Sequence, residues 1–135
     1  MPYVVLVFVT RNPTLTSEEF RDHWENTHIP LMKSLTGRLF PLLHTRRYLA
    51  RTDRLGYGGP ANRDRPPLVL RGSIDNFDYD ATAELTFESE DAFRRFYRAL
   101  YEPETAAILS RDEELFLDTG KIITVVVGDT QSTPR

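Results

Sequence analysis

The stretch FRDHWENTHIP, residues 20–30, places two of the three histidines and the only tryptophan on one short predicted helix. An α-helix turns by about 100° per residue, so Trp24 and His28, four residues apart, lie on the same side. Phe20 and Leu31 extend that side into an apolar stripe. An imidazole at the edge of such a stripe is either an acid/base group in an apolar pocket or a structural residue packed on an apolar face.

Residues on both sides of this stretch mark where the helix begins and where it breaks. Thr16 and Glu19 have the spacing of a capping box at the helix start. Pro30 lacks an N–H and crowds the preceding turn, so it is expected to kink or restart the helix. A second helical segment is expected over residues 30–35, ended by Gly37.

The remaining elements follow from the spacing of apolar residues. Residues 3–9, YVVLVFV, are apolar at nearly every position, which is typical of a central strand buried on both faces. A long irregular stretch at 52–79 is rich in glycine and proline. Further strands are expected at 42–51, 80–87 and 122–127, and further helices after Ser89 and over 104–116.

This element order predicts an α+β fold with the ferredoxin-like arrangement β-α-β-β-α-β. One domain is expected over residues 1–128, followed by a flexible C-terminal tail over 129–135. The helices can cover one face of a four-stranded sheet only, and the other face mixes valines with polar and charged residues. Packing two such faces together would cover them, so a homodimer is expected, with a lined cavity between each sheet and its helices.

Composition removes several classes of function. The 135 residues contain no cysteine, which excludes disulfides and thiolate chemistry, and the net charge of −3 does not favour nucleic acid or an anionic membrane as a partner. The opening apolar run is too short to span a bilayer, so a cytoplasmic protein is expected. The sequence has no phosphate loop, dinucleotide fingerprint or G-x-S-x-G elbow, and no metal or other cofactor is expected.

The strand expected at 42–51 carries a second group of candidate residues. His44, Arg46 and Tyr48 alternate along one face, about 7 Å apart per step. If that face borders the cavity, Arg46 could hold a carboxylate or enolate and Tyr48 could donate a proton. If it faces outward, the row is an ordinary polar strand face.

Four further residues are candidates with weaker signals. His23 lies five residues before His28, roughly 140° around an α-helix, which is the wrong spacing for two ligands on one face. Its alternatives are a substrate contact or a hydrogen bond to a neighbouring loop. Asp80 could orient a histidine, or could lie at a solvated strand edge. Trp24 and Phe8 are candidates for the pocket wall.

Two motifs carry a resemblance to a known family. The pattern Phe20-x-x-His23-Trp24-x-x-x-His28-x-Pro30 resembles the EthD-domain family, as does DYDATAELTF at residues 78–87. The similarity covers nearly the whole chain except the tail and the loop. It implies a dimeric α+β barrel and, in fungal-type members found beside polyketide synthases, dehydratases or decarboxylases. It also favours the catalytic interpretation of His28.

The sequence therefore predicts a lyase or cyclase that acts by histidine acid/base chemistry on an aromatic, polyketide-like small molecule. In that mechanism a histidine removes a proton next to a carbonyl, and an arginine or tyrosine stabilises the enolate. The alternatives are a cofactor-independent isomerase, an oxygenase acting on a phenol, and a non-catalytic ligand-binding accessory protein.

Overall fold

The computed structural model describes residues 2–51, 67–73 and 77–135. The parts of the predicted 52–79 loop at 52–66 and 74–76 lie outside the described residues. The elements in chain order are β1 (Tyr3–Val9), α1 (Ser17–His23), the π-helical turn η1 (Trp24–His28), α2 (Ile29–Thr36), η2 (Gly37–Leu39), β2 (Leu43–Tyr48), β3 (Ala81–Phe87), α3 (Glu90–Leu100), α4 (Pro103–Phe116), η4 (Thr119–Lys121) and β4 (Ile123–Val126).

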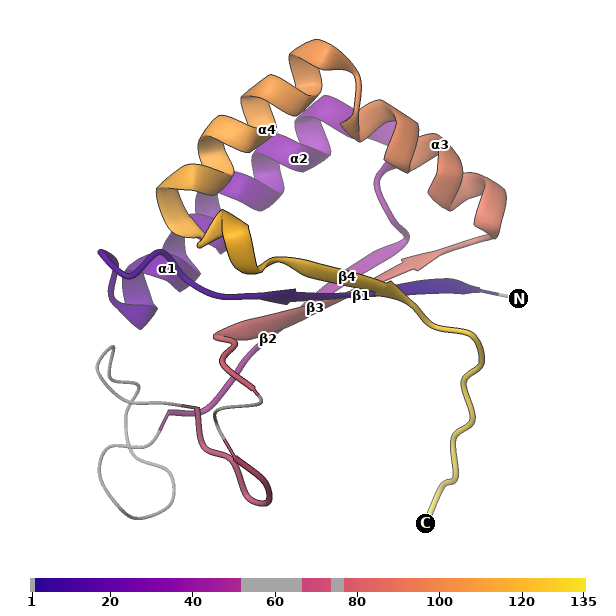
Figure 1. The fold of residues 1–135 in the computed structure, drawn as a ribbon. Coiled ribbons are helices and arrows are strands. Elements are labelled where there is room, and N and C mark those ends of the chain that lie inside the picture. The colour runs from indigo at the N-terminus through magenta and orange to yellow at the C-terminus, as the bar shows by residue number, and fades with distance from the viewer. Residues whose placement is uncertain (1, 52–66, 74–76) are drawn as a thin grey trace.

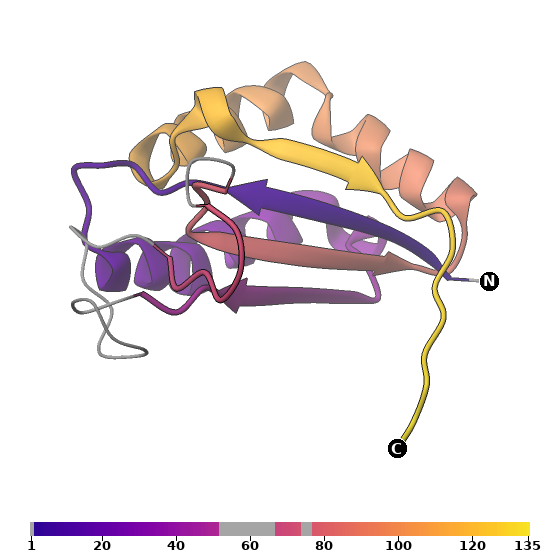
Figure 2. The same ribbon diagram turned by 60° about the horizontal axis from the view of Figure 1, so that its bottom comes forward.

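The four strands form one antiparallel sheet in the order β2-β3-β1-β4, and the helices all lie on one side of it (Figure 1). This arrangement confirms the predicted α+β, ferredoxin-like fold. Two helices, α3 and α4, together connect β3 to β4. Figure 2 shows the four strands side by side in front of the helical layer.

The core lies between the sheet and the helices because apolar residues alternate along the strands. In β3, Ala81, Ala83, Leu85 and Phe87 are buried, while the residues between them are partly exposed. Large rings from the helices complete this layer. The largest fully buried side chains are those of Phe20, Phe87, Phe96, Phe116 and Val5.

The first helical region has the predicted start and stop, with a widened turn between. Thr16 and Glu19 form both hydrogen bonds of the capping box. Gly37 ends α2 with a φ of +53°, a conformation that favours glycine. Within η1, the N–H of Ile29 donates to the carbonyl of Trp24, five residues back. A π-turn relieves the crowding that a proline ring causes in a regular α-helix, and Pro30 is the second residue after this turn.

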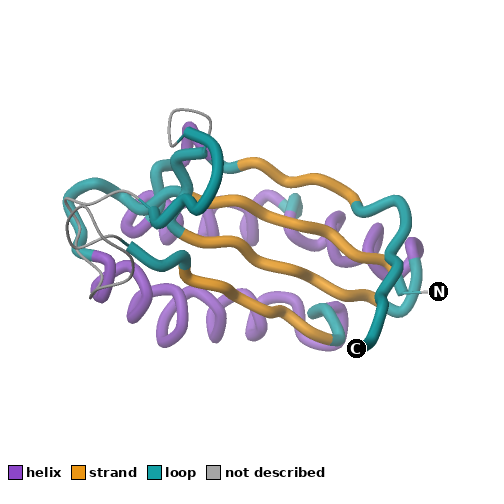
Figure 3. Tube along the Cα trace, turned by 90° about the horizontal axis from the view of Figure 1, so that it is seen from below, coloured by secondary structure: helices purple, strands orange, loops and turns teal. Residues whose placement is uncertain are grey.

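None of the helices that the structure describes covers the other face of the sheet (Figure 3). The strand register places several apolar side chains on this face. β1 was predicted to be buried on both faces, but in the single chain only Val5 and Val9 are buried there. Leu6 pairs with Val125, and Phe8 pairs with Ile123. We call the side chains on this side the open face; its apolar members are Val4, Leu6, Phe8, Leu43, Ile123 and Val125.

Candidate active site

A cavity of about 490 Å³ lies between the sheet and the helices. Its walls are mainly aliphatic and aromatic. Val5, Val7 and Val9 of β1 form part of its floor, and Trp24 and Phe116 contribute rings from the helical layer. Its volume falls in the range of small-molecule sites, which are concave and mostly apolar with a few polar groups. His28, His44 and Glu113 are titratable groups that line it.

His28 is held by a carboxylate from a distant helix. Its Nδ1 lies 2.7 Å from Oδ2 of Asp112 in α4, and the exposed fraction of His28 is 3 %. Burial lowers the pKa of His28 below its ordinary value, and Asp112 offsets part of that effect. An ionised carboxylate only accepts hydrogen bonds, so the neutral ring carries its proton on Nδ1. The lone pair of Nε2 is then free to act as a base toward a molecule in the cavity.

The π-turn brings His23 to the same carboxylate. Nε2 of His23 lies 2.9 Å from Oδ1 of Asp112, although His23 and His28 are five residues apart. The expectation that this spacing separates the two rings is therefore wrong, because the i→i+5 hydrogen bond of the π-turn adds a residue and brings positions five apart to nearly the same side. His23 does not line the cavity in the described structure; it helps to fix Asp112 and stacks on Phe116.

His44 also lines the cavity, but as the opposite neutral tautomer to His28. Nη1 of Arg46 donates to Nδ1 of His44 at 2.9 Å, since a guanidinium has no acceptor. The neutral ring therefore carries its proton on Nε2. Burial and the nearby charge of Arg46 lower the pKa of His44 to about 4, so the ring is neutral near pH 7. The cavity thus contains one imidazole that can accept a proton at Nε2 and one that can donate a hydrogen bond there.

Arg46 and Tyr48 pair with Glu25 and do not line the cavity. Both contact Glu25 of η1: Nε of Arg46 lies 2.6 Å from Oε2, and the Tyr48 hydroxyl donates to the same oxygen. The strand face that carries His44, Arg46 and Tyr48 points toward the helices. This is the first of the two alternatives considered from the sequence. Their expected direct role on a carboxylate or enolate is not supported, because both side chains are occupied by Glu25.

Glu113 is a cavity residue that the sequence analysis missed. Burial is the main cause that raises its pKa above the ordinary value, and the neighbouring charge of Asp112 adds to this. A carboxyl group with a raised pKa is suited to donate a proton. The available signal was the spacing of Glu113, four residues after Leu109 and three before Phe116, which puts this acid, like Asp112, on the inward side of α4.

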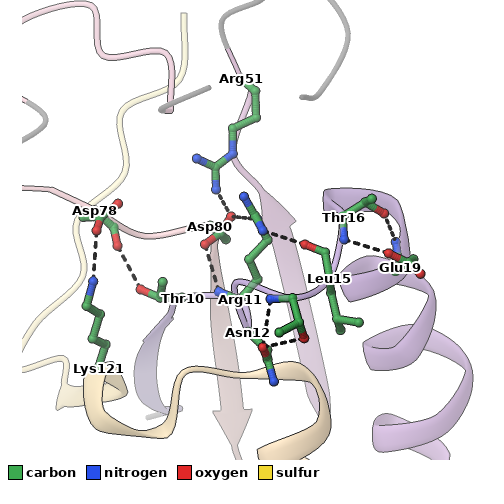
Figure 4. A network of polar contacts seen from close by, with 11 residues as sticks. Thr10, Arg11, Asn12, Leu15, Thr16, Glu19, Arg51, Asp78, Asp80 and Lys121 are labelled. Carbon is green, nitrogen blue, oxygen red and sulfur yellow. Dashed lines mark hydrogen bonds and ion pairs between the residues drawn. The ribbon is translucent and has the colours of Figure 1, made fainter. Parts of the chain in front are cut away.

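Two predicted site residues lie elsewhere. Asp80 was expected to orient a histidine, but its carboxylate pairs with Arg11, whose backbone N–H donates to Oδ2 at 2.8 Å, and with Arg51 (Figure 4). Asp80 thus links the start of β3 to the segments that follow β1 and β2. The carboxylate that contacts the histidines is that of Asp112. Phe8 was expected in the pocket wall, but it lies on the open face and contacts Phe77 and Tyr79. Trp24, by contrast, lines the cavity.

Comparisons with known proteins agree with this architecture. The sequence profile of the EthD domain matches residues 12–120. An EthD family protein from Bacillus halodurans has a similar structure, with a TM-score of 0.54, 16% identity, and coverage of 95% of this chain and 99% of the other. An EthD-like protein from Ralstonia eutropha gives a TM-score of 0.52 at 16% identity, covering 93% and 87%.

Another similar structure, described as a dimeric ferredoxin-like protein of unknown function from Thermobifida fusca, has a TM-score of 0.49 at 17% identity, covering 94% and 90%. No curated protein matches the sequence. In the described part of the chain, none of the helices has the length and apolar character needed to cross a bilayer.

Proposed function

We propose that this chain, which belongs to the EthD domain family, is an enzyme that transfers protons on a small carbonyl compound in the cavity above its sheet. The observation that carries the proposal is the pairing of His28 and His44. Both rings line one apolar cavity, and their partners hold them as opposite neutral tautomers, with the proton on Nδ1 of His28 and on Nε2 of His44. Such a pair can remove a proton from carbon while hydrogen-bonding the oxygen that becomes negative.

The reaction we favour is a dehydration or a dehydrative ring closure, of the lyase or cyclase type. Nε2 of His28 takes a proton from the carbon next to the carbonyl, and the C–H electrons move onto oxygen as an enolate. The Nε2–H of His44 donates to that oxygen. When the enolate collapses, the β-carbon loses its hydroxyl group, which takes a proton from Glu113 and leaves as water. Proton transfer from His28 back to Glu113, through solvent, restores the starting state.

The cavity wall supports a flat, largely apolar substrate. Rings of Trp24, Phe96 and Phe116 border a space whose polar groups are few. Apolar lining with a few convergent polar groups suits an aromatic or pre-aromatic molecule, such as a polyketide-like compound, better than a sugar or a nucleotide. Water would be largely excluded from the imidazoles, which strengthens each hydrogen bond to developing charge.

The proton-removal step can be tested without knowledge of the natural substrate. We would measure deuterium exchange at the methyl group of 2-acetylnaphthalene in D₂O by NMR. The wild-type protein should accelerate exchange, and His28→Gln should lose about 10²–10⁴-fold of that acceleration. Glu114→Gln, an exposed change on α4 beside the cavity residue Glu113, is the control. Equal exchange in the wild type and in His28→Gln, with both folded, would remove His28 from the chemistry.

We also propose that two copies pair through their open faces. Contiguous exposed apolar residues mark interaction surfaces, and Ile123 and Val125 are 44% and 42% exposed. A self-complementary face suits a two-fold dimer. Leu6→Glu places a charge at the centre of this face and should convert the dimer to a monomer in sedimentation equilibrium, while Arg95→Gln, on α3 at the opposite side of the sheet, should leave the mass unchanged. A wild-type monomer at millimolar concentration would contradict the proposal.

A further inference from the structure

A second hollow lies on the outer side of α3 and shares walls with the cavity. This groove has a volume of about 300 Å³ and is lined by Phe93, Arg94, Tyr97, Arg98 and Tyr101. The three aromatic residues among these also line the cavity. Tyr97 and Tyr101 are 40% and 65% exposed, so the same rings border the interior space and bulk solvent. The cavity therefore reaches the surface where α3 ends.

The aromatic side chains form a continuous row at this exit. Phe93 and Tyr97 lie one helical turn apart, with ring centroids at 5.2 Å, and Tyr97 and Tyr101 at 4.9 Å. The two tyrosine hydroxyl groups are 3.2 Å apart, within hydrogen-bond distance. Phe93 stacks on Tyr3 at 5.0 Å, which anchors the inner end of the row to β1. Such rings offer stacking surface to a flat molecule that passes between the groove and the cavity.

The groove carries positive charge that the lining of the cavity lacks. Within the described residues, its charged lining consists of Arg94 and Arg98. Arg94 is 64% exposed and makes only a loose ion pair with Glu90 at 3.5 Å. The cavity, by contrast, contains Glu113 and two imidazoles. A molecule that spans both spaces would be held with its anion at the arginines and its uncharged end among the imidazoles.

We propose that this groove is the entrance to the cavity and a binding subsite for the carboxylate of an aromatic acid. The aromatic part lies along Tyr97 and Tyr101, and the carboxylate stays outside with Arg94 and Arg98. This rests on the proposed function, because it takes the cavity as the reaction chamber. It also selects among the lyase reactions: a carboxylate held in the groove is kept away from His28 and is retained, so the reaction eliminates water or closes a ring and releases no carbon dioxide.

The test compares 2-naphthoate with 2-naphthamide, which has nearly the same shape and no charge. Binding is followed by the fluorescence of Trp24, the only tryptophan, which lines the cavity. The wild type should bind the naphthoate more tightly. Arg98→Gln and Arg94→Gln should each weaken it by about two- to fivefold and leave the amide unchanged. Arg95→Gln is the matched control, since Arg95 has its own i,i+4 pair with Asp91 but does not line the groove.

Equal affinity for the two probes, or an equal effect of Arg95→Gln and Arg98→Gln, would overturn the subsite. Tyr97→Ala should weaken both probes, because it removes the stacking surface; unchanged binding of both would overturn the entrance. His28→Gln separates this proposal from the catalytic one, since it should abolish deuterium exchange and preserve the preference for the naphthoate. Equal affinity for the two probes in a wild-type protein whose deuterium exchange depends on His28 would contradict the subsite alone.

Discussion

Replacing His44 by glutamine should change how the stability of the protein depends on pH. The pKa of His44 is about 4 in the folded protein and about 6.5 when the ring is exposed. As pH falls below 6.5, the unfolded chain binds a proton at this position and the folded chain does not, so the wild-type protein loses stability. The loss continues until the pH reaches the folded pKa near 4.

The size of the effect follows from these two pKa values. A tenfold change in a protonation equilibrium corresponds to about 1.4 kcal/mol, so between pH 7.5 and pH 5 the wild type should lose about 2 kcal/mol through His44. Glutamine does not titrate, and its carbonyl oxygen can still accept from Arg46. The variant should be less stable than the wild type at pH 7.5. The difference between their free energies of unfolding, called the gap below, should narrow by about 2 kcal/mol at pH 5.

Urea unfolding followed by Trp24 fluorescence would measure this gap, because Trp24 is buried in the folded chain. Arg47→Gln on the same strand is the control, since arginine does not titrate in this range and its gap should be constant. Carboxylates that titrate near pH 5 change the free energy of unfolding of all three proteins alike. Their effect therefore cancels when a variant is compared with the wild type. A gap between wild type and His44→Gln that is constant within about 0.5 kcal/mol would refute the burial of a neutral His44.

Three further substitutions test the framework around the site. Asp112→Asn should lower the free energy of unfolding by about 1–3 kcal/mol, because an NH2 group, which cannot accept, replaces one of the two oxygens that contact the histidines. It should also lower the pKa of His28 further, which NMR titration would detect; an unchanged pKa would contradict the contact. Phe87→Ala should cost about 3–5 kcal/mol in urea unfolding, since its ring is 1% exposed and packs on Phe93 and Phe96; a loss below about 1 kcal/mol would argue against this core. Thr16→Ala should cost about 1 kcal/mol through loss of the N-cap, whereas Thr14→Ala, outside the cap, should cost less.

Local patterns were sufficient to predict the sheet and the helix ends. Alternation in residues 80–87 is reproduced by the buried and exposed positions of β3, and Ser89 caps α3 through the N–H of Ala92. The stop at Gly37 and the disturbance at Pro30 were also correct. Each of these features depends on residues within a few positions of one another, which is the range over which sequence periodicity carries information.

The site itself depends on contacts that periodicity does not report. Asp112 meets His28 and His23 across 84 and 89 residues of chain. Its spacing from Leu109 and Phe116 indicates a buried acid but does not identify its partners. The angle between the two histidines was estimated for a regular α-helix, and the π-turn changes it. Arg46 looked free to hold a substrate because its partner Glu25 lies on another element.

The π-turn also affects how this chain should be aligned with its relatives. A turn with one extra residue is equivalent to a single-residue insertion within a helix, and the inserted position lies between Trp24 and His28. A gapless alignment to a relative with a regular α-helix would match either the residues before this turn or those after it, and would shift the other half by one position. At 16% identity, sequence similarity alone does not reveal a shift of one position. The histidines should therefore be compared by superposing the structures, with a gap allowed at Asn26 or Thr27.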